Sequence, residues 1–177
     1  MTIPDEQTWS FKDARSLLDD ETMAELVEIK NTFDELGGGN GTKKKRDERF
    51  KPLGWEAEKT AKFTADVASH MEEDADSLSR TVDFDAYKPG IVLEHERIEM
   101  MRAAWHLTKM DGTRQELDQR GLDVDVGVLL IPKGAIASAD PDKQAGLRRV
   151  QETIRTLMSP VADFSTPLFV WEYIPED

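Results

Sequence analysis

The run VDVGVLLIP, residues 124–132, constrains the fold most strongly because it is apolar at almost every position. A run of this kind is typical of a strand that is covered on both faces of a sheet. Residues 167–175, PLFVWEYIP, predict a further strand. Apolar residues at helical spacing predict helices over 97–120 and near 142–158, and these helices can cover the strands.

Three antiparallel strands are predicted in the middle of the chain. Apolar residues follow a period of two from Trp55 to residue 67, which is typical of a half-buried strand. The segments TVDFDAY and GIVLEHE, at 81–87 and 90–96, lie on either side of a Lys-Pro-Gly turn and predict a hairpin. Residues 70–80 are interpreted as the loop that joins the first strand to this hairpin.

The first part of the chain is predicted to be mainly helical. Residues 20–36 carry apolar side chains at helical spacing, and the three glycines that follow terminate the pattern. A shorter helical piece is expected over 10–18, with Ser10 as its N-cap. Residues 37–54 are rich in glycine and then in basic residues, match no helix or strand pattern, and are predicted to form a mobile loop.

The order of these elements is helix, three strands, helix, strand, helix, strand. It predicts an α/β (α+β) fold in which a mixed central β-sheet with an antiparallel meander is flanked by helices. A chain of 177 residues is long enough for one domain with a proper core, so we expect a single domain over 1–177.

The composition is strongly acidic. Asp and Glu number 36 against 23 Lys and Arg, which gives a net charge of −13. This charge either excludes a nucleic-acid partner or reflects a halophilic host, whose salty cytoplasm screens charges over short distances, and we favour the halophilic interpretation. The chain has no cysteine, no apolar run long enough to cross a bilayer and no secretory signal, so we expect a soluble, cytoplasmic protein.

Four acidic side chains gather on the predicted hairpin. If residues 89 and 90 form a two-residue turn, Asp85 lies opposite Glu94 and Asp83 lies opposite Glu96. Strand alternation then places these four carboxylates on one face of the hairpin. The other face is expected to carry Val82, Phe84, Ala86, Ile91, Leu93 and His95.

Carboxylates held this close either raise one another's pKa or bind a cation. Oxygen ligands in a chain without cysteine favour a hard ion such as Mg²⁺. Mg²⁺ stabilises charge on a phosphoryl oxygen, so hydrolysis of a phosphodiester is a chemistry that such a face supports. The alternative is a solvated acidic face in an acidic protein.

The arrangement of these pieces resembles the PD-(D/E)XK nuclease core and, more narrowly, type II restriction endonucleases of the BglII and BamHI kind. The resemblance rests on DAYKPGIVLEHE at 85–96 and, after a helix, on DVDVGVLLIP at 123–132. Gly54 and Trp55, just before the first strand, match a recurring feature of BglII-like proteins. The resemblance spans about residues 54–132 and implies a restriction-endonuclease-like core.

The resemblance also implies roles for three acids. Asp85 and Glu94 match the residues that bind Mg²⁺, so both are expected to be catalytic residues and metal ligands. Glu96 matches a third catalytic position, which usually holds lysine in the superfamily, an acid in the BamHI branch and glutamine in the BglII branch. Glu96 is expected to act as a general base, as a ligand of a second ion or as a group that orients water. Asp83 is the rival of Asp85 for the first position.

The function that the resemblance implies is Mg²⁺-dependent cleavage of double-stranded DNA at a specific site by a type II restriction endonuclease, acting as a homodimer. Two alternatives remain. One is a non-catalytic acidic binding protein on a nuclease-like scaffold, and the other is a DNA repair or junction nuclease on the same core.

The most basic stretch of the chain is a candidate for DNA contact. Basic side chains neutralise phosphates, and a flexible basic loop would close around a duplex, although a solvated loop is the alternative. The residues concerned are Lys43, Lys44, Lys45, Arg46 and Arg49.

Other polar residues have less specific interpretations. His95 is expected to be buried or hydrogen-bonded on the apolar face, and His70 and His106 have no partner at ligand spacing. Glu25 and Glu28 of the first long helix either approach the metal or lie on a solvated face.

Overall fold

Six strands form one mixed sheet in the order β1-β6-β5-β4-β3-β2. The structure is a computed structural model that describes residues 3, 7–36, 42–64, 79–96, 101–115, 122–133, 146–155 and 164–175. Its elements are β1 (Thr8–Phe11), the 3-10 helix η2 (Ala14–Leu17), α1 (Asp20–Leu36), α2 (Lys43–Phe50), the 3-10 helix η3 (Lys51–Leu53), β2 (Glu56–Thr64), β3 (Ser79–Lys88), β4 (Gly90–His95), α3 (Met101–Gln115), β5 (Val124–Pro132), α5 (Gly146–Thr153) and β6 (Leu168–Tyr173).

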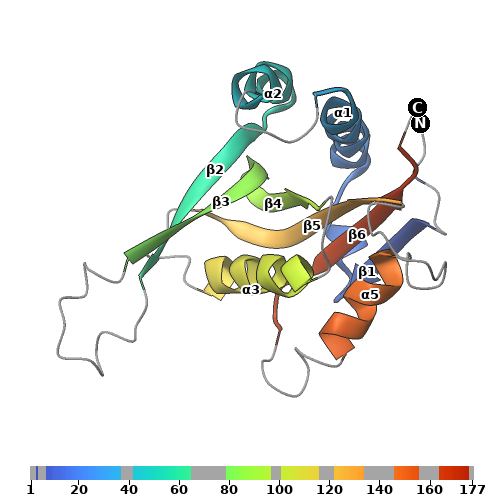
Figure 1. Cartoon of the computed structure of the whole chain (residues 1–177), viewed down its shortest axis with the longest axis vertical. Coiled ribbons are helices and arrows are strands. Elements are labelled where there is room, and N and C mark those ends of the chain that lie inside the picture. Colours follow the sequence, from blue (N-terminus) through green and yellow to red (C-terminus); the bar gives the residue numbers. More distant parts are fainter. Residues whose placement is uncertain are drawn as a thin grey trace.

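The sheet combines a parallel centre with antiparallel edges. β4, β5 and β6 run parallel, whereas β2, β3 and β4 form an antiparallel meander and β1 pairs antiparallel with β6. Figure 1 shows β2 and β3 extending away from the other strands as a two-stranded arm. The predicted mixed sheet with an antiparallel meander and flanking helices is confirmed.

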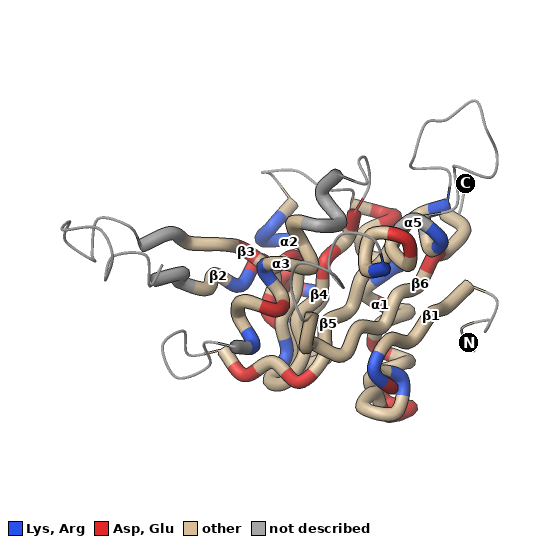
Figure 2. Tube along the Cα trace, turned by 90° about the horizontal axis from the view of Figure 1, so that it is seen from below, with Lys and Arg blue, Asp and Glu red and all other residues tan. Residues whose placement is uncertain are grey.

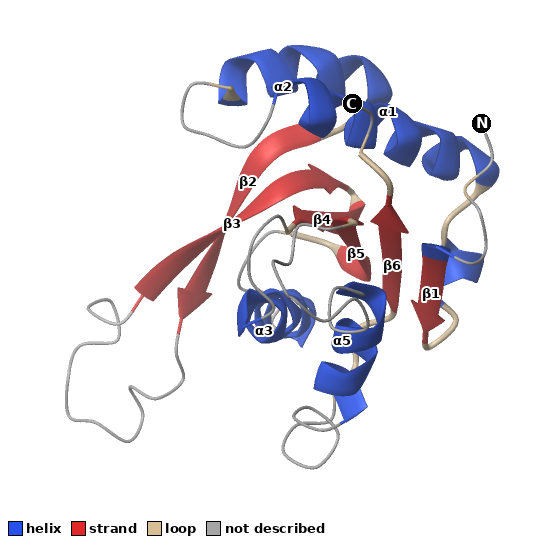
Figure 3. Cartoon of the chain, turned by 45° about the vertical axis from the view of Figure 1, so that its right-hand side comes forward, coloured by secondary structure: helices blue, strands red, loops and turns tan. Residues whose placement is uncertain are grey.

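Helices cover both faces of the sheet. α1 and α2 lie on one face and α3 and α5 on the other, as Figure 3 shows. The two cores divide β5 between them, because Val126, Val128 and Leu130 pack on the α1 side while Leu129 and Ile131 pack on the α3 side. This double burial explains why the run at 124–132 is almost continuously apolar.

The predicted long helix at 20–36 is confirmed as α1. Its first turn is capped by Asp19, whose Oδ1 accepts a hydrogen bond of 2.7 Å from the backbone N–H of Thr22. Leu26, Ile29 and Phe33 are buried on its sheet-facing side.

The two later helices lie within the predicted ranges. α3 is confirmed over Met101–Gln115 and α5 over Gly146–Thr153, and the predicted positions 97–100, 116–120, 142–145 and 156–158 lie outside the described residues. In the part of the chain that the structure describes, no helix has the length and apolar character needed to cross a membrane.

The helical piece predicted over 10–18 is confirmed only at Ala14–Leu17, which form η2, and was wrong for residues 10–13. Residues up to Phe11 form the edge strand β1, and a turn with positive φ at Lys12 and Asp13 leads into the short η2. Ser10 does not cap a helix. Its Oγ accepts a hydrogen bond from the N–H of Arg15 across the turn. The strand forms because β6 offers a free edge and because Phe11 packs on Phe164, whose ring lies 5.7 Å away.

The loop predicted over 37–54 was wrong for residues 43–53, because the basic stretch forms α2 and η3. This helix has no recognisable apolar pattern in the sequence, because Phe50 is its only apolar residue that packs in the core. Arg46, one turn earlier, is also buried, and its guanidinium lies 5.5 Å from the centre of the Phe33 ring. Residues 37–41 lie outside the described residues.

The predicted hairpin register is confirmed close to the turn and wrong beyond it. Lys88 pairs with Ile91, and the pairing ends two residues earlier on β3, at Ala86 opposite Leu93. The predicted pairs of Asp85 with Glu94 and of Asp83 with Glu96 therefore do not form. Gly90 has a φ of 86°, which suits the second central residue of a Pro-Gly turn.

The predicted face of the hairpin was also partly wrong. Ala86 and Leu93 pack on the α1 side as expected, but Val82 and Phe84 pack on the α3 side. β3 leaves β4 at Ala86 and continues with β2 into the twisted arm, where Glu58 of β2 has a left-handed φ of 51°. The predicted loop at 70–80 ends earlier, because residues 79 and 80 belong to β3, and positions 65–78 lie outside the described residues.

Glu25 joins α1 to the beginning of the meander. Its carboxylate accepts hydrogen bonds from Trp55 Nε1 at 2.8 Å and from Lys88 Nζ at 2.8 and 2.9 Å. The carboxylate is buried, so the ammonium of Lys88 supplies the opposite charge that its burial requires.

We expect Glu25→Ala to lower the free energy of unfolding by about 2–4 kcal/mol, because it leaves the Trp55 indole and the Lys88 ammonium without their acceptor. Urea denaturation measures this change. The matched control is Glu28→Ala, one turn along the same helix and exposed, which should change the value by less than about 0.5 kcal/mol. Equal losses for the two variants would contradict a structural role of the Glu25 contacts.

Candidate active site

Glu94 is the most deeply buried acid of the predicted site. It lies near the end of β4, which runs between β3 and β5, and only 2% of its surface is exposed. Its side chain faces α3. A carboxylate in this environment needs partners of opposite charge, because burial without them is very unfavourable.

Two cationic side chains of α3 meet Glu94. Lys109 Nζ forms an ion pair with Oε1, and His106 Nδ1 lies 3.0 Å from Oε2. His106 Nε2 lies 2.6 Å from Oε2 of Glu96, so one imidazole bridges two of the predicted catalytic acids. His106 and Lys109 are three residues apart and therefore share one face of the helix.

The bridging imidazole is held in its charged form. Burial disfavours the imidazolium, but hydrogen bonds with Glu94 and Glu96 outweigh this effect and raise the pKa of His106 to about 9. His106 is therefore protonated at neutral pH and acts as a positive charge between the two acids.

Asp85 approaches the same place from β3. Its Oδ2 accepts a hydrogen bond of 2.8 Å from the backbone N–H of His95, the residue that follows Glu94. Burial and the negative charge of Glu94 together raise the pKa of Asp85 to about 6. Asp85 and Glu94 thus come close enough to influence each other, although they are not directly opposite in the register.

Asp83, the rival for the first catalytic position, lies elsewhere. Its side chain is exposed, and Oδ1 accepts a hydrogen bond of 2.6 Å from Thr60 Oγ1 on β2. Its backbone carbonyl is nevertheless part of the site, because it accepts a hydrogen bond of 2.6 Å from Lys109 Nζ. The geometry favours Asp85 over Asp83 as the partner of Glu94.

His95 is buried and hydrogen-bonded, as predicted. Its ring stacks on Phe33 with centroids 4.4 Å apart, and Nε2 lies 2.7 Å from the hydroxyl of Tyr173. Tyr173 in turn donates a hydrogen bond of 3.0 Å to Asp34 on α1. These contacts fix the strand segment whose N–H binds Asp85.

The predicted DNA-binding residues lie on α2, and most of them pair with acids. Arg46 is buried against Glu58, Lys43 Nζ lies 3.4 Å from Glu58 Oε2, and Arg49 pairs with Glu35. Figure 2 shows basic and acidic positions spread over many elements of the chain. Lys44 and Lys45 are the basic residues of the stretch that are most available to a ligand, because both are exposed. Lys44 Nζ has one ion pair, of 4.0 Å, with Glu48 on the same helix.

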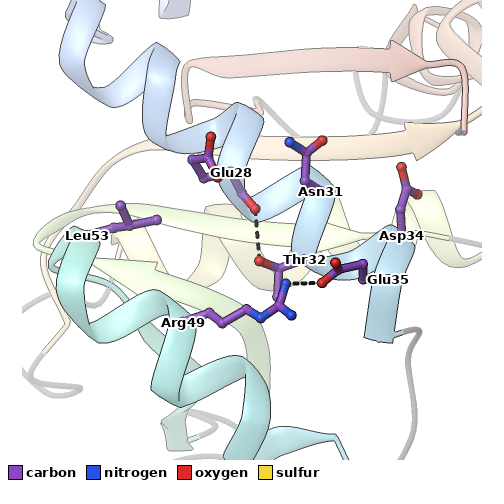
Figure 4. Close-up of a pocket in the computed structure, with 7 residues that line it drawn as sticks. All are labelled: Glu28, Asn31, Thr32, Asp34, Glu35, Arg49 and Leu53. Atoms are coloured by element: carbon purple, nitrogen blue, oxygen red, sulfur yellow. Dashed lines mark hydrogen bonds and ion pairs between the residues drawn. The ribbon is translucent and has the colours of Figure 1, made fainter.

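A cavity of about 710 Å³ lies between α1 and α2, away from the acids of the hairpin. Figure 4 shows its polar wall and the ion pair of Arg49 with Glu35 that crosses it. Glu28 lines this cavity and Glu25 binds Trp55, so neither helix acid joins Asp85 and Glu94. The lining residues are Glu28, Asn31, Thr32, Asp34, Glu35, Arg49 and Leu53.

The donor set at the hairpin fits a hard divalent cation in its chemistry. Asp85, Glu94 and Glu96 supply only carboxylate oxygens, and burial together with the charge of Glu94 raises the pKa of Asp85. Among the described residues, no three His, Asp or Glu side chains are already arranged in the geometry of a metal site. Instead, both carboxylate oxygens of Glu94 face the cationic side chains of Lys109 and His106 on α3.

Sequence reasoning missed His106 and Lys109. His70 lies outside the described residues. His106 does have acidic partners, but they are Glu94 of β4 and Glu96 just after it, which are not at ligand spacing from His106 along the chain. A trace is present in the sequence: His106, Lys109 and Thr113 recur at helical spacing beside the buried Leu107 and Met110. The same pattern is also typical of a solvated helix face, so it could not be distinguished without the fold.

The chain has a restriction-endonuclease-like fold. It is similar to the crystal structure of restriction endonuclease BglII complexed with a DNA 16-mer, with a TM-score of 0.59 and 13% sequence identity, over 96% of this chain and 76% of that chain. No family model and no curated protein matches the sequence. The likeness concerns the fold, since the identity is too low to carry individual residues across.

We expect Asp85→Asn to stabilise the protein at pH 8 in the absence of divalent ions. Folding raises the pKa of Asp85 from 3.8 to about 6, so the folded state favours the neutral carboxyl, and the free energy of unfolding falls as pH rises through this interval. The asparagine is neutral and keeps an oxygen for the His95 N–H. Its expected gain is about 1–3 kcal/mol in urea denaturation with EDTA.

The pH dependence provides the control for Asp85→Asn. As pH is lowered toward 4, Asp85 becomes neutral in the wild type as well, so the advantage of the variant should shrink toward zero. A gain that is equally large at pH 4 and pH 8 would show that the charge of Asp85 is not its cause.

Proposed function

We propose that the protein is a Mg²⁺-dependent endonuclease that cleaves double-stranded DNA at a specific site, as type II restriction endonucleases do. The observation that supports it best is the meeting of Asp85, from β3, with the buried Glu94, from β4, inside a restriction-endonuclease-like fold. The structural neighbour was solved with a DNA 16-mer, which supports DNA as the substrate. A homodimer, with one subunit for each strand, is part of the proposal.

Each acid has a separate role in the proposed hydrolysis. Asp85 and Glu94 would hold the ion, which when bound stabilises negative charge on the phosphoryl oxygens of the scissile group. Glu96 would orient the attacking water and accept its proton as the oxygen bonds to phosphorus and the bond to the leaving oxygen breaks. His106 fixes the orientation of Glu96 through the 2.6 Å contact with its Oε2.

A non-catalytic acidic binding protein is the second candidate. It is favoured by one observation, namely that Lys109 and His106 already neutralise Glu94 while no three-residue metal site is formed among the described residues. In that case the charged cluster would serve only to hold α3 against β4.

A plasmid assay separates these functions. We expect linear or discretely cut plasmid with Mg²⁺ and intact plasmid with EDTA, tested at low and at molar salt because the chain is strongly acidic. A smear would indicate a non-specific nuclease, and faster cleavage of branched than of linear DNA would indicate a junction nuclease. Intact plasmid at every salt concentration would favour the binding protein.

Asp85→Ala and Glu94→Ala should each lower the cleavage rate by at least about a hundredfold, the scale expected for loss of one catalytic group. Circular dichroism checks that the variants are folded. Asp83→Ala is the matched control, since Asp83 is exposed and bound to Thr60, and it should retain most of the activity. Cleavage at the wild-type rate by Asp85→Ala or Glu94→Ala would remove that residue from the mechanism.

Lys44 and Lys45 are the members of the basic stretch whose role in DNA binding is easiest to test. The double variant Lys44→Gln, Lys45→Gln should weaken binding of a duplex roughly 3- to 10-fold in EDTA and lower the slope of log K against log salt by about 1–2. Fluorescence anisotropy measures both. Lys12→Gln, on a turn remote from α2, should leave the slope unchanged, and an equal effect of the two changes would exclude a specific contact by α2.

A further inference from the structure

Lys109 is a buried charge that the proposed hydrolysis does not use. Only 5% of its surface is exposed, its Nζ pairs with Glu94 Oε1, and the same Nζ donates a hydrogen bond of 2.6 Å to the carbonyl oxygen of Asp83. The ammonium also lies 5.0 Å from the centre of the Phe84 ring. These contacts hold it between β4, which carries Glu94, and the part of β3 that carries Asp85.

The position of Lys109 matters because Glu94 has only two oxygens. Oε2 faces His106 at 3.0 Å, and Oε1 is taken by Lys109. A divalent ion held by Asp85 and Glu94 needs at least one of these oxygens, and it would bring two further positive charges beside the ammonium. Like charges at such spacing repel strongly inside a protein, where the dielectric constant is low.

We propose that Lys109 is an internal counter-ion that competes with the divalent ion for Glu94. Without metal, the ammonium compensates the buried carboxylate and keeps α3 docked on β4. Binding of metal through Oε1 requires Lys109 to withdraw, and binding through Oε2 places the ion beside the ammonium, so in either case the Lys109–Glu94 pair weakens metal binding while it stabilises the metal-free protein. This inference rests on the proposed function, because it assumes that Glu94 is a metal ligand.

Removal of the ammonium should therefore have opposite effects on two measurable quantities. Lys109→Met should lower the melting temperature in EDTA, because it leaves Glu94 with less compensating charge. The same variant should bind Mg²⁺ more tightly, with a dissociation constant reduced roughly tenfold or more. A merely structural lysine would lower stability without tightening metal binding.

Isothermal titration calorimetry with Mg²⁺ on the full chain, together with thermal denaturation in EDTA and in Mg²⁺, tests the proposal. Lys109→Arg keeps the charge and should stay within about threefold of the wild-type dissociation constant. Lys12→Met removes an exposed positive charge elsewhere and should not change it. If Lys109→Met does not fold in EDTA, Lys109→Gln replaces it, because glutamine can still donate to the Asp83 carbonyl but carries no charge.

The possible outcomes separate this inference from the proposed function. Tighter binding by the neutral variants, lost again when Glu94→Gln is added, supports competition at Glu94. Unchanged or weaker binding by the neutral variants overturns the competition while the wild type still binds Mg²⁺. If neither the wild type nor any Lys109 variant binds Mg²⁺, the metal-dependent function fails and the competition fails with it.

Discussion

The burial of the Glu94 carboxylate is the interaction on which the rest of the site depends. A charge that is 2% exposed is tolerated only with close partners, and α3 provides them from two positions one turn apart. This requirement fixes the rotation of α3 above the sheet, directs Leu107 and Met110 into the core on that side and brings His106 to Glu96. Electrostatics and packing therefore specify the same docking of α3.

Much of the fold could be predicted from hydrophobic patterns, because central strands are buried on both faces whereas the helices that cover them bury only one side. The doubly covered β5 is continuously apolar, and α1 shows a helical stripe that ends at glycines, so both could be predicted. β1 and α2 could not. Their stability comes from partners distant in sequence: β1 is completed by the edge of β6, and α2 is held by Phe50 and by the pairing of Arg46 with Glu58.

Only the acids of the candidate site could be predicted from the sequence, whereas their cationic partners could not, for a related reason. The hairpin pattern predicted a group of four acids, and the resemblance to a nuclease core selected Asp85, Glu94 and Glu96 among them, but simple alternation could not foresee that β3 leaves β4 at Ala86. That departure turns Phe84 toward α3 and lets the carboxylate of Asp85 reach the backbone of His95. The cationic side chains that pair with these acids lie on α3. In the sequence of a helix, polar residues that face the sheet cannot be distinguished from polar residues that face solvent.

The pairing of β1 with β6 has a consequence for how the chain reaches this structure. Thr8 lies opposite Trp171, so completion of the sheet brings together segments separated by most of the sequence, and the entropy of closing so large a loop slows this step. Before it occurs, β6 presents the apolar segment LFVWEY with unpaired backbone groups along one side. Once it is paired, the short strand β1 therefore protects the completed sheet from joining another molecule edge to edge.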